Sequence, residues 1–146
     1  MKDELQYTTE VKWDNQTGAE VNIGRFPTLR LDMPVEFGGE GRYPCPDELF
    51  LSAVAACLLT TFLYFKKAMK FHVKGLHVSA KQTIWKPKVD GYRIGGIDAL
   101  IRVKVKTQER RRAEKCVELA KKYCHITRSL ETAIPIHIST QVELKE

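Results

Sequence analysis

Residues 49–65 read LFLSAVAACLLTTFLYF, an apolar run that contains no charged side chain. Asp47 and Glu48 precede this run, and Lys66 and Lys67 follow it. Proline suits the first turn of a helix, and acidic residues at the start and basic residues at the end oppose the helix dipole. The stretch that opens at Pro46 is therefore predicted to form one long apolar helix.

An apolar helix of this kind can also be a membrane span. The run has 17 residues, which is at the short end of the spanning length, and Ser52, Thr60 and Thr61 interrupt it. The rest of the chain has the composition of a soluble domain that needs a central element to cover. We therefore expect no membrane association and a helix that the fold buries on every side.

The segments on both sides of this helix alternate between apolar and polar residues, as strands do. The predicted strands are Thr8–Trp13, Ala19–Ile23, Leu29–Met33, Phe71–Ile84, Ile97–Lys106 and Ile136–Val142. Pro87–Gly96 is predicted to connect the fourth and fifth of these strands. This order of elements predicts an α+β fold with helices packed against antiparallel sheets, in a single domain of residues 1–146.

A second helix is predicted over Thr107–Tyr123. Thr107 can cap it, and apolar side chains recur at spacings of three and four residues along one face. The residues of this face are Ala113, Cys116, Val117, Ala120 and Cys124.

Composition favours a globular domain, with 29% charged and 43% hydrophobic residues and a net charge of +6. The basic residues are spread along the chain without a zinc-finger, KH or RNP pattern, so we expect no nucleic-acid partner. Met1–Leu5 has no apolar core of a signal peptide, so a cytoplasmic location is expected. In that compartment four cysteines favour thiol chemistry or simple burial over a disulfide framework.

Cys57 and Cys124 stand in different surroundings. Cys57 lies in the middle of the apolar helix, where a cysteine often behaves as a small buried hydrophobe. Cys124 follows Lys121 and Lys122 and precedes His125 and Arg128, and nearby positive charge lowers the pKa of a thiol. Cys124 can equally be a residue that completes an apolar helix face.

Two segments together resemble a known family. Pro46–Cys57, PDELFLSAVAAC, resembles the proline–acid–leucine–alanine-rich–cysteine signature of the OsmC/Ohr superfamily of osmotically inducible and organic hydroperoxide resistance proteins. Cys124–Leu130, CHITRSL, is similar to its second motif, Cys-Pro-x-[Ser/Thr]-Arg-x-Leu. The order of elements matches over the whole chain. His125 in place of the usual proline indicates an outlying OsmC-like branch.

The resemblance implies an intertwined homodimer with the first helix of each subunit at its centre. It also implies peroxidase activity on organic hydroperoxides, in oxidative stress defence, without a cofactor or metal. Cys57 would be the peroxidatic cysteine and Cys124 the resolving one, with a dithiol as the reductant. Leu58, Phe62 and the loop around Phe37 are expected to form an apolar wall for the substrate.

The hydroperoxide-resistance branch pairs its first cysteine with an arginine from an N-terminal turn and a glutamate just after the helix-opening proline. Asp47 matches the glutamate position with a shorter acid. The arginine position falls near residues 15–17, which are Asn, Gln and Thr. Three arginines are candidates to replace it: Arg25, Arg30 and Arg42.

Cys45 and Cys116 have no motif support. We expect Cys116 in the core and Cys45 in the loop before the first helix. The four cysteines contain no C-x₂₋₄-C pair, so a zinc site is not expected. The alternative to a peroxidase is a non-catalytic dimer that binds a small apolar ligand or senses oxidants through Cys57 and Cys124.

Overall fold

The computed structural model describes residues 3–146. The first two residues of Met1–Leu5, on which the expected absence of a signal peptide rests, lie outside the described residues. The chain forms two compact units, Met1–Phe50 and Leu51–Glu146. Helix α1 (Pro46–Met69) begins in the first unit and continues in the second. The predicted α+β class is confirmed.

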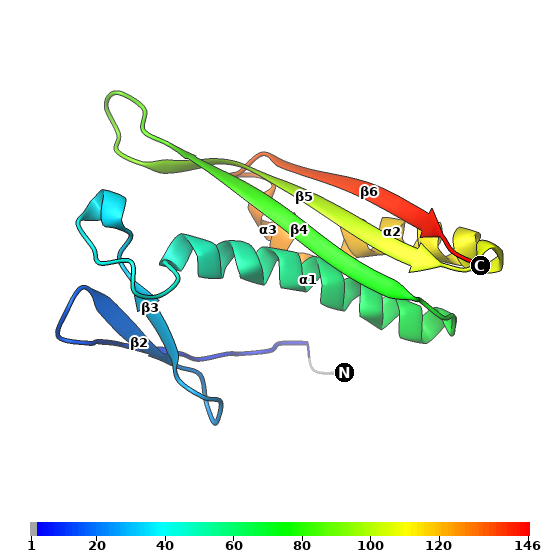
Figure 1. The fold of residues 1–146 in the computed structure, drawn as a ribbon, viewed down its shortest axis with the longest axis horizontal. Coiled ribbons are helices and arrows are strands. Elements are labelled where there is room, and N and C mark those ends of the chain that lie inside the picture. The colour runs from blue at the N-terminus through cyan, green and yellow to red at the C-terminus, as the bar shows by residue number, and fades with distance from the viewer. Residues whose placement is uncertain (1–2) are drawn as a thin grey trace. The chain divides into compact units, whose positions relative to one another are not determined.

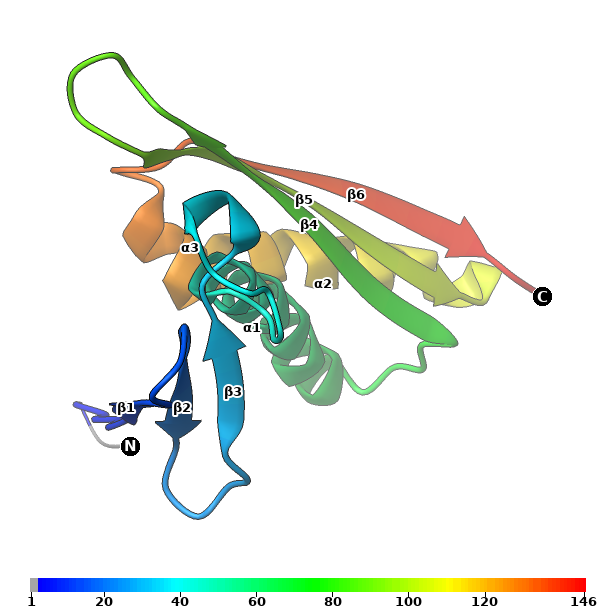
Figure 2. The ribbon, with the colours of Figure 1, turned by 60° about the vertical axis from the view of Figure 1, so that its left-hand side comes forward.

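The first unit is built on a three-stranded antiparallel sheet. Its strands are β1 (Glu10–Trp13), β2 (Gly18–Asn22) and β3 (Leu29–Asp32). Figure 2 shows β2 and β3 side by side, and β2 also pairs with β1, which gives the order β1-β2-β3. A short 3-10 helix, η1 (Val35–Phe37), follows in the glycine- and proline-rich loop. All three strands lie within the predicted segments to within one residue.

A buried ion pair ties this loop to the sheet. The Asp32 side chain is 1% exposed, and its carboxylate accepts hydrogen bonds from the Thr17 hydroxyl at 2.6 Å and from Arg42 Nε at 2.8 Å. The same guanidinium donates to Asp14 Oδ2 at 2.6 Å and to Gln16 Oε1 at 2.7 Å. Arg42 therefore holds the β1–β2 turn, the end of β3 and the loop before α1 in one arrangement.

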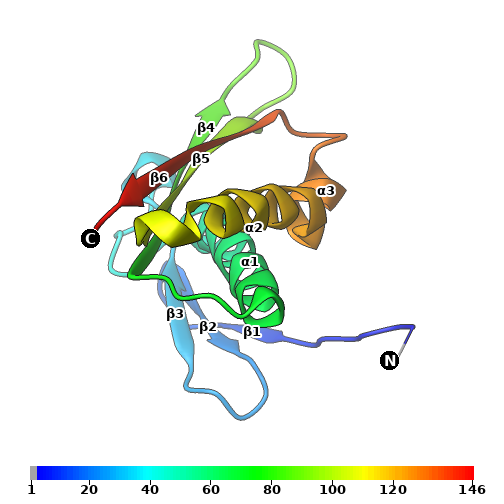
Figure 3. The same cartoon turned by 90° about the vertical axis from the view of Figure 1, so that its right-hand side faces the viewer.

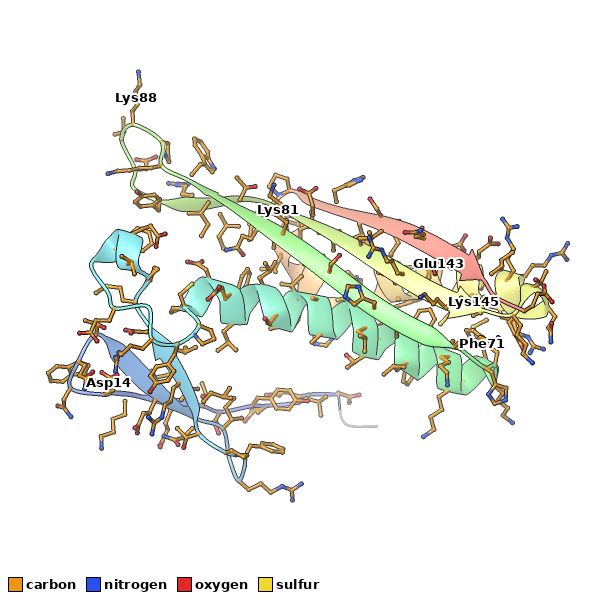
Figure 4. The ribbon with its side chains drawn as sticks, in the orientation of Figure 1. Asp14, Phe71, Lys81, Lys88, Glu143 and Lys145 are labelled. Atoms are coloured by element: carbon orange, nitrogen blue, oxygen red, sulfur yellow. The ribbon has the colours of Figure 1, made fainter. Side chains whose placement is uncertain are left out.

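The second unit contains a three-stranded sheet of mixed direction. Its strands are β4 (Gly75–Trp85), β5 (Arg93–Val105) and β6 (Ile136–Leu144). β4 and β5 are antiparallel and joined by a loop with Lys88 at its outer end, whereas β5 and β6 are parallel (Figure 4). The prediction of purely antiparallel sheets is wrong for this pair. A parallel partner needs a long crossover, and the helices between β5 and β6 provide it.

This crossover contains two helices where one was predicted. The 3-10 helix η2 (Thr107–Glu109) leads into α2 (Arg110–Tyr123), and α3 (His125–Leu130) follows after a break at Cys124. The prediction that Thr107 caps the helix is wrong. Its hydroxyl donates instead to Glu146 Oε1 at 2.9 Å, and Glu109 precedes α2.

Both long helices of this unit lie on the same face of the β4-β5-β6 sheet (Figures 1 and 3). The inward residues of β5 alternate with exposed ones and share a core with the predicted face of α2. The fully packed residues of this core include Leu58, Phe62, Phe71, Ile101, Val103, Val105, Ala113, Cys116, Val117, Ala120 and Cys124. The predicted apolar face of α2 is therefore confirmed.

Helix α1 has clear local signals at both ends. The Glu48 carboxylate accepts a hydrogen bond from the Cys45 backbone N–H at 2.8 Å, as in half of a capping box. Lys70, with a φ of 52°, leaves the helical conformation directly after Met69.

The coverage of α1 differs from the prediction. Its buried residues are Val54, Cys57, Leu58 and Phe62, which form one face, whereas Tyr64 is 70% exposed. By length and composition the helix could cross a membrane, and 22% of its most apolar window is buried. Only one face of α1 is thus buried within a single copy of the chain. The prediction that the helix is buried on every side is wrong for one copy.

The charged network of the first unit makes its stability depend on pH. Burial alone would raise the pKa of Asp32, but hydrogen bonds from Thr17, Arg42 and Met33 outweigh it and hold this pKa well below the usual 3.8. A lowered pKa in the folded state stabilises the fold above the unfolded pKa, and this contribution is lost as the pH falls below about 4.

We therefore expect Asp32→Asn to lower the free energy of unfolding at pH 7, and the difference from wild type to shrink below about pH 4. Urea titrations at each pH, followed by Trp13 fluorescence in a Trp85→Phe background, measure the free energy of unfolding. Glu10→Gln, an exposed acid on the same sheet, is the matched control. A difference that stays constant from pH 7 to pH 3 would contradict the ionic origin of the stabilisation.

Candidate active site around Cys57 and Cys124

Cys57 lies near the middle of α1 on its buried face and is 7% exposed. One turn later, the Thr61 hydroxyl donates to the Cys57 carbonyl oxygen at 2.7 Å, and its oxygen lies 4.0 Å from Cys57 Sγ. The sulfur therefore lies at the edge of the core with a polar group beside it.

Cys124 lies at the break between α2 and α3. Its φ of −62° and ψ of 105° are extended, so the residue ends one helix and precedes the next. Its N–H donates to the Ala120 carbonyl at 3.0 Å, and its carbonyl accepts from the Arg128 N–H at 3.0 Å. Bonds to both helices therefore fix the fully buried side chain in place.

The Cys57 and Cys124 thiols are neighbours that interact with each other. Burial raises the pKa of the Cys124 thiol, Thr127 partly opposes this, and the neighbouring Cys57 raises it further. The expectation that nearby basic residues lower the pKa of Cys124 is wrong. Lys121, Lys122 and Arg128 are exposed, whereas the thiol points into the core.

His125 completes this cluster from the first residue of α3. Its Nδ1 lies 3.9 Å from Cys57 Sγ, within the range of a hydrogen bond to sulfur, and the residue is exposed. From the sequence, His125 was predicted to be a basic neighbour of Cys124 and a replacement for the usual proline, without a catalytic role. A histidine adjacent to the second cysteine was the signal that could have identified it.

The other predicted site residues belong to the first unit. Asp47 lies in the first turn of α1 and belongs, with the three candidate arginines, to the first unit. Arg42 is paired with Asp14 and Asp32, and Arg30 donates to the Tyr43 hydroxyl at 3.2 Å. Within the second unit, the structure thus brings together Cys57, Cys124 and His125.

A hollow of about 570 Å³ opens beside Thr61. Its lining consists of Thr60, Thr61, Tyr64, Phe65, Leu119 and Tyr123. Sequence analysis expected Leu58 and Phe62 to face the substrate, but both are fully buried in the core. The apolar surface nearest the thiols therefore comes from the next turn of α1 and from the end of α2.

Cys45 and Cys116 stand apart from the pair. Cys116 is fully buried, as expected, and its thiol donates to the Phe62 carbonyl at 3.3 Å; burial raises its pKa to about 11. Cys45 is a partly buried loop thiol before α1. No group of three or more potential metal ligands occurs among residues 3–146.

With one thiol in a central helix and a neighbouring thiol at a break between two helices, the chain is an α+β protein with a buried pair of cysteines. The family model of the OsmC-like proteins matches residues 37–139, which include both cysteines and His125. The chain belongs to this family, and the resemblance inferred from the two motifs is confirmed.

Solved structures of this family have the same fold. An organic hydroperoxide resistance protein OsmC from Legionella pneumophila is 21% identical, with a TM-score of 0.74 over 97% of this chain and 100% of the other. An organic hydroperoxide resistance protein from Elizabethkingia anophelis is 18% identical, with a TM-score of 0.75 over 99% of this chain and 100% of the other. An OsmC-like protein from Mycoplasma pneumoniae is 17% identical, with a TM-score of 0.79 over 97% and 99%. No curated protein matches the sequence.

Burial predicts which thiols resist modification. A pKa of about 11 instead of 9.0 reduces the thiolate fraction of Cys116 about a hundredfold at neutral pH, and Cys124 is equally inaccessible. We expect iodoacetamide at pH 7 to label Cys45 and to spare Cys116 and Cys124, as quantified by peptide mass spectrometry. All four cysteines should react in guanidinium chloride. Labelling of Cys124 as fast as Cys45 in the folded protein would contradict its burial.

Proposed function

We propose that the protein is a thiol-dependent peroxidase that reduces organic hydroperoxides, in defence against oxidative stress. The observation that carries the proposal is that the Cys57 thiol of α1 and the Cys124 thiol at the break between α2 and α3 are neighbours. The names of the relatives from Legionella and Elizabethkingia, both organic hydroperoxide resistance proteins, support this class of substrate.

The proposed reaction has two chemical steps. The Cys57 thiolate attacks the terminal oxygen of R–O–OH, so that an S–O bond forms, the O–O bond breaks and the alcohol ROH leaves after protonation. Cys57 becomes a sulfenic acid, which the Cys124 thiol attacks to form a disulfide and release water. A dithiol then reduces the disulfide to two thiols and is itself oxidised.

Differences between the two thiols support this order of roles. Cys57 is slightly exposed, whereas Cys124 is fully buried with a raised pKa, so a peroxide reaches Cys57 first. Cys124 lies next to the Cys57 sulfur, where it can reach a sulfenic acid formed on Cys57. Cys124 needs to react only after Cys57 has become electrophilic.

The hollow beside Thr61 supports binding of the organic part of the hydroperoxide. Aromatic side chains from α1 and α2, including Tyr64, Phe65 and Tyr123, line it, and its volume of about 570 Å³ suits a molecule of several carbon atoms. The same hollow favours the second candidate function, a dimer that binds a small apolar ligand without turnover. The thiol pair is what favours the peroxidase.

A homodimer is part of the proposal. The side of α1 that its own chain leaves uncovered includes Leu63, which is 43% exposed, and Tyr64. A second copy offers the same apolar surface and so can cover it by symmetry. In this dimer we assign Asp47 the role of an acid that positions a cation for the site. A cytoplasmic location, where a dithiol reductant is available, is also proposed.

We expect the wild type to sediment at about twice the monomer mass of 16.7 kDa at micromolar concentration. Leu63→Glu should shift the protein toward a monomer, because a charge would be buried in an apolar interface. Lys67→Glu, near the end of α1, is the control and should leave the dimer intact. A folded wild-type monomer at micromolar concentration would remove the dimer from the proposal.

Substitution of single cysteines tests the chemistry. Cys57→Ser should abolish reduction of an alkyl hydroperoxide, because a hydroxyl is far less nucleophilic than a thiolate near neutral pH. Cys124→Ser should keep the first turnover and leave Cys57 as a sulfenic acid that over-oxidises. Cys45→Ser is the control and should keep turnover. Peroxide consumption and mass-spectrometric mapping of sulfur oxidation measure these outcomes.

After one equivalent of peroxide, the wild type should contain a Cys57–Cys124 disulfide. If both thiols stay unmodified and no peroxide is consumed, the proposed peroxidase function is wrong. The alternative, binding of a small apolar ligand, then takes its place.

A further inference from the structure

The Cys57 thiol needs a proton acceptor, because the thiolate and not the thiol is the nucleophile. Cys57 lies at the edge of the core and is 7% exposed, so few water molecules can take the proton directly. One of the groups that contact the sulfur must therefore accept the thiol proton.

Among the described residues of the second unit, three groups neighbour this sulfur, and two of them cannot take the proton. The Thr61 hydroxyl already donates its hydrogen to the Cys57 carbonyl, and an alcohol oxygen is not a base near neutral pH. Burial raises the pKa of the Cys124 thiol, so this neighbour stays protonated and is not a base. The remaining neighbour is the imidazole of His125, with Nδ1 3.9 Å from Cys57 Sγ.

We propose that His125 is the catalytic base of Cys57: Nδ1 accepts the thiol proton, and the product is a thiolate–imidazolium pair. A cysteine activated by an adjacent histidine is a general solution for thiol nucleophiles. His125 occupies the first position of α3 directly after Cys124, so the break between α2 and α3 positions both the resolving thiol and the base.

The exposure of His125 suits this role. Cys57 is 7% exposed, whereas His125 is an exposed residue. An imidazole can take a proton at one nitrogen and exchange it with water at the other. His125 therefore connects a buried sulfur to solvent without opening the core.

The inference rests on the proposed function for its second step. When the thiolate attacks the terminal peroxide oxygen, the O–O bond breaks and an alkoxide leaves. The proton that His125 took from Cys57 passes to this alkoxide, which gives the alcohol and returns a neutral imidazole. Sulfur is oxidised by two electrons, the peroxide is reduced by two, and no further reactant is needed.

The test measures the thiolate without any peroxide. The rate of Cys57 alkylation by iodoacetamide at pH 7 is compared in wild type, His125→Asn and His125→Pro, with peptide mass spectrometry as the readout. Proline suits the first position of a helix, so His125→Pro should keep the start of α3 while it removes the base. We expect both variants to slow alkylation of Cys57 about tenfold or more.

Three comparisons make the result specific. His137→Asn replaces an exposed histidine on β6 and should leave the rate unchanged. Cys45 in each sample should react at the wild-type rate, and Cys116 should stay unlabelled, which shows that the core is intact. Wild-type alkylation rates at Cys57 in both His125 variants would overturn the proposal.

A second measurement does not require the His125 variants to fold. In wild type at pH 7, the ring nitrogens of His125 should give the NMR signals of an imidazolium, and in Cys57→Ser they should revert to a neutral ring. A neutral His125 ring in wild type would overturn the pair. If alkylation slows as expected and yet no peroxide is consumed, His125 is the base and the peroxidase function alone is wrong.

Discussion

Because α1 is apolar around most of its circumference, the rest of the second unit has to supply apolar surface to cover it. β5 and α2 do so with alternating and heptad-like sets of small and branched side chains. Burial of a side chain such as Leu58 or Phe62 stabilises the folded state by about 1.5–3 kcal/mol compared with leaving it exposed to water. Packing α2 close to α1 also brings the break at Cys124 against Cys57, so the thiol pair is a consequence of covering this helix.

The four cysteines show what separates a reactive thiol from an inert one. Cys116 is as buried as Cys124, but its neighbour is the Phe62 carbonyl, an acceptor that stabilises only the neutral thiol. Cys57 instead has the Cys124 thiol as a neighbour and the His125 imidazole, the proposed base, 3.9 Å from its sulfur. Burial is common to these residues, and the polar groups that face each sulfur decide its chemistry.

Sequence periodicity was sufficient for the helices and strands, since the inward residues of β5 and the buried face of α2 follow their patterns closely. It was insufficient where spatial neighbours differ from sequence neighbours. The basic residues around Cys124 suggested a lowered pKa, but a helix directs Lys121 and Lys122 to solvent while Cys124 points inward. Alternation also carries no information on strand direction, so the parallel pairing of β5 and β6 was missed. The Arg42 network joins residues up to 28 positions apart, and no local pattern marks it.

The charge of Arg42 is balanced by acids of its own unit. Its guanidinium lies against Gln16, in the turn where the resemblance places an arginine, but it is paired with Asp14 and Asp32, and Glu40 lies 3.2 Å from its Nε. A cation neutralised by several carboxylates provides little net potential to stabilise a thiolate. Arg42 thus serves mainly to hold the first unit together. A neutral base such as an imidazole can accept the thiol proton without the positive potential of a nearby arginine. The presence of a histidine, and not a proline, beside Cys124 in this chain is consistent with that.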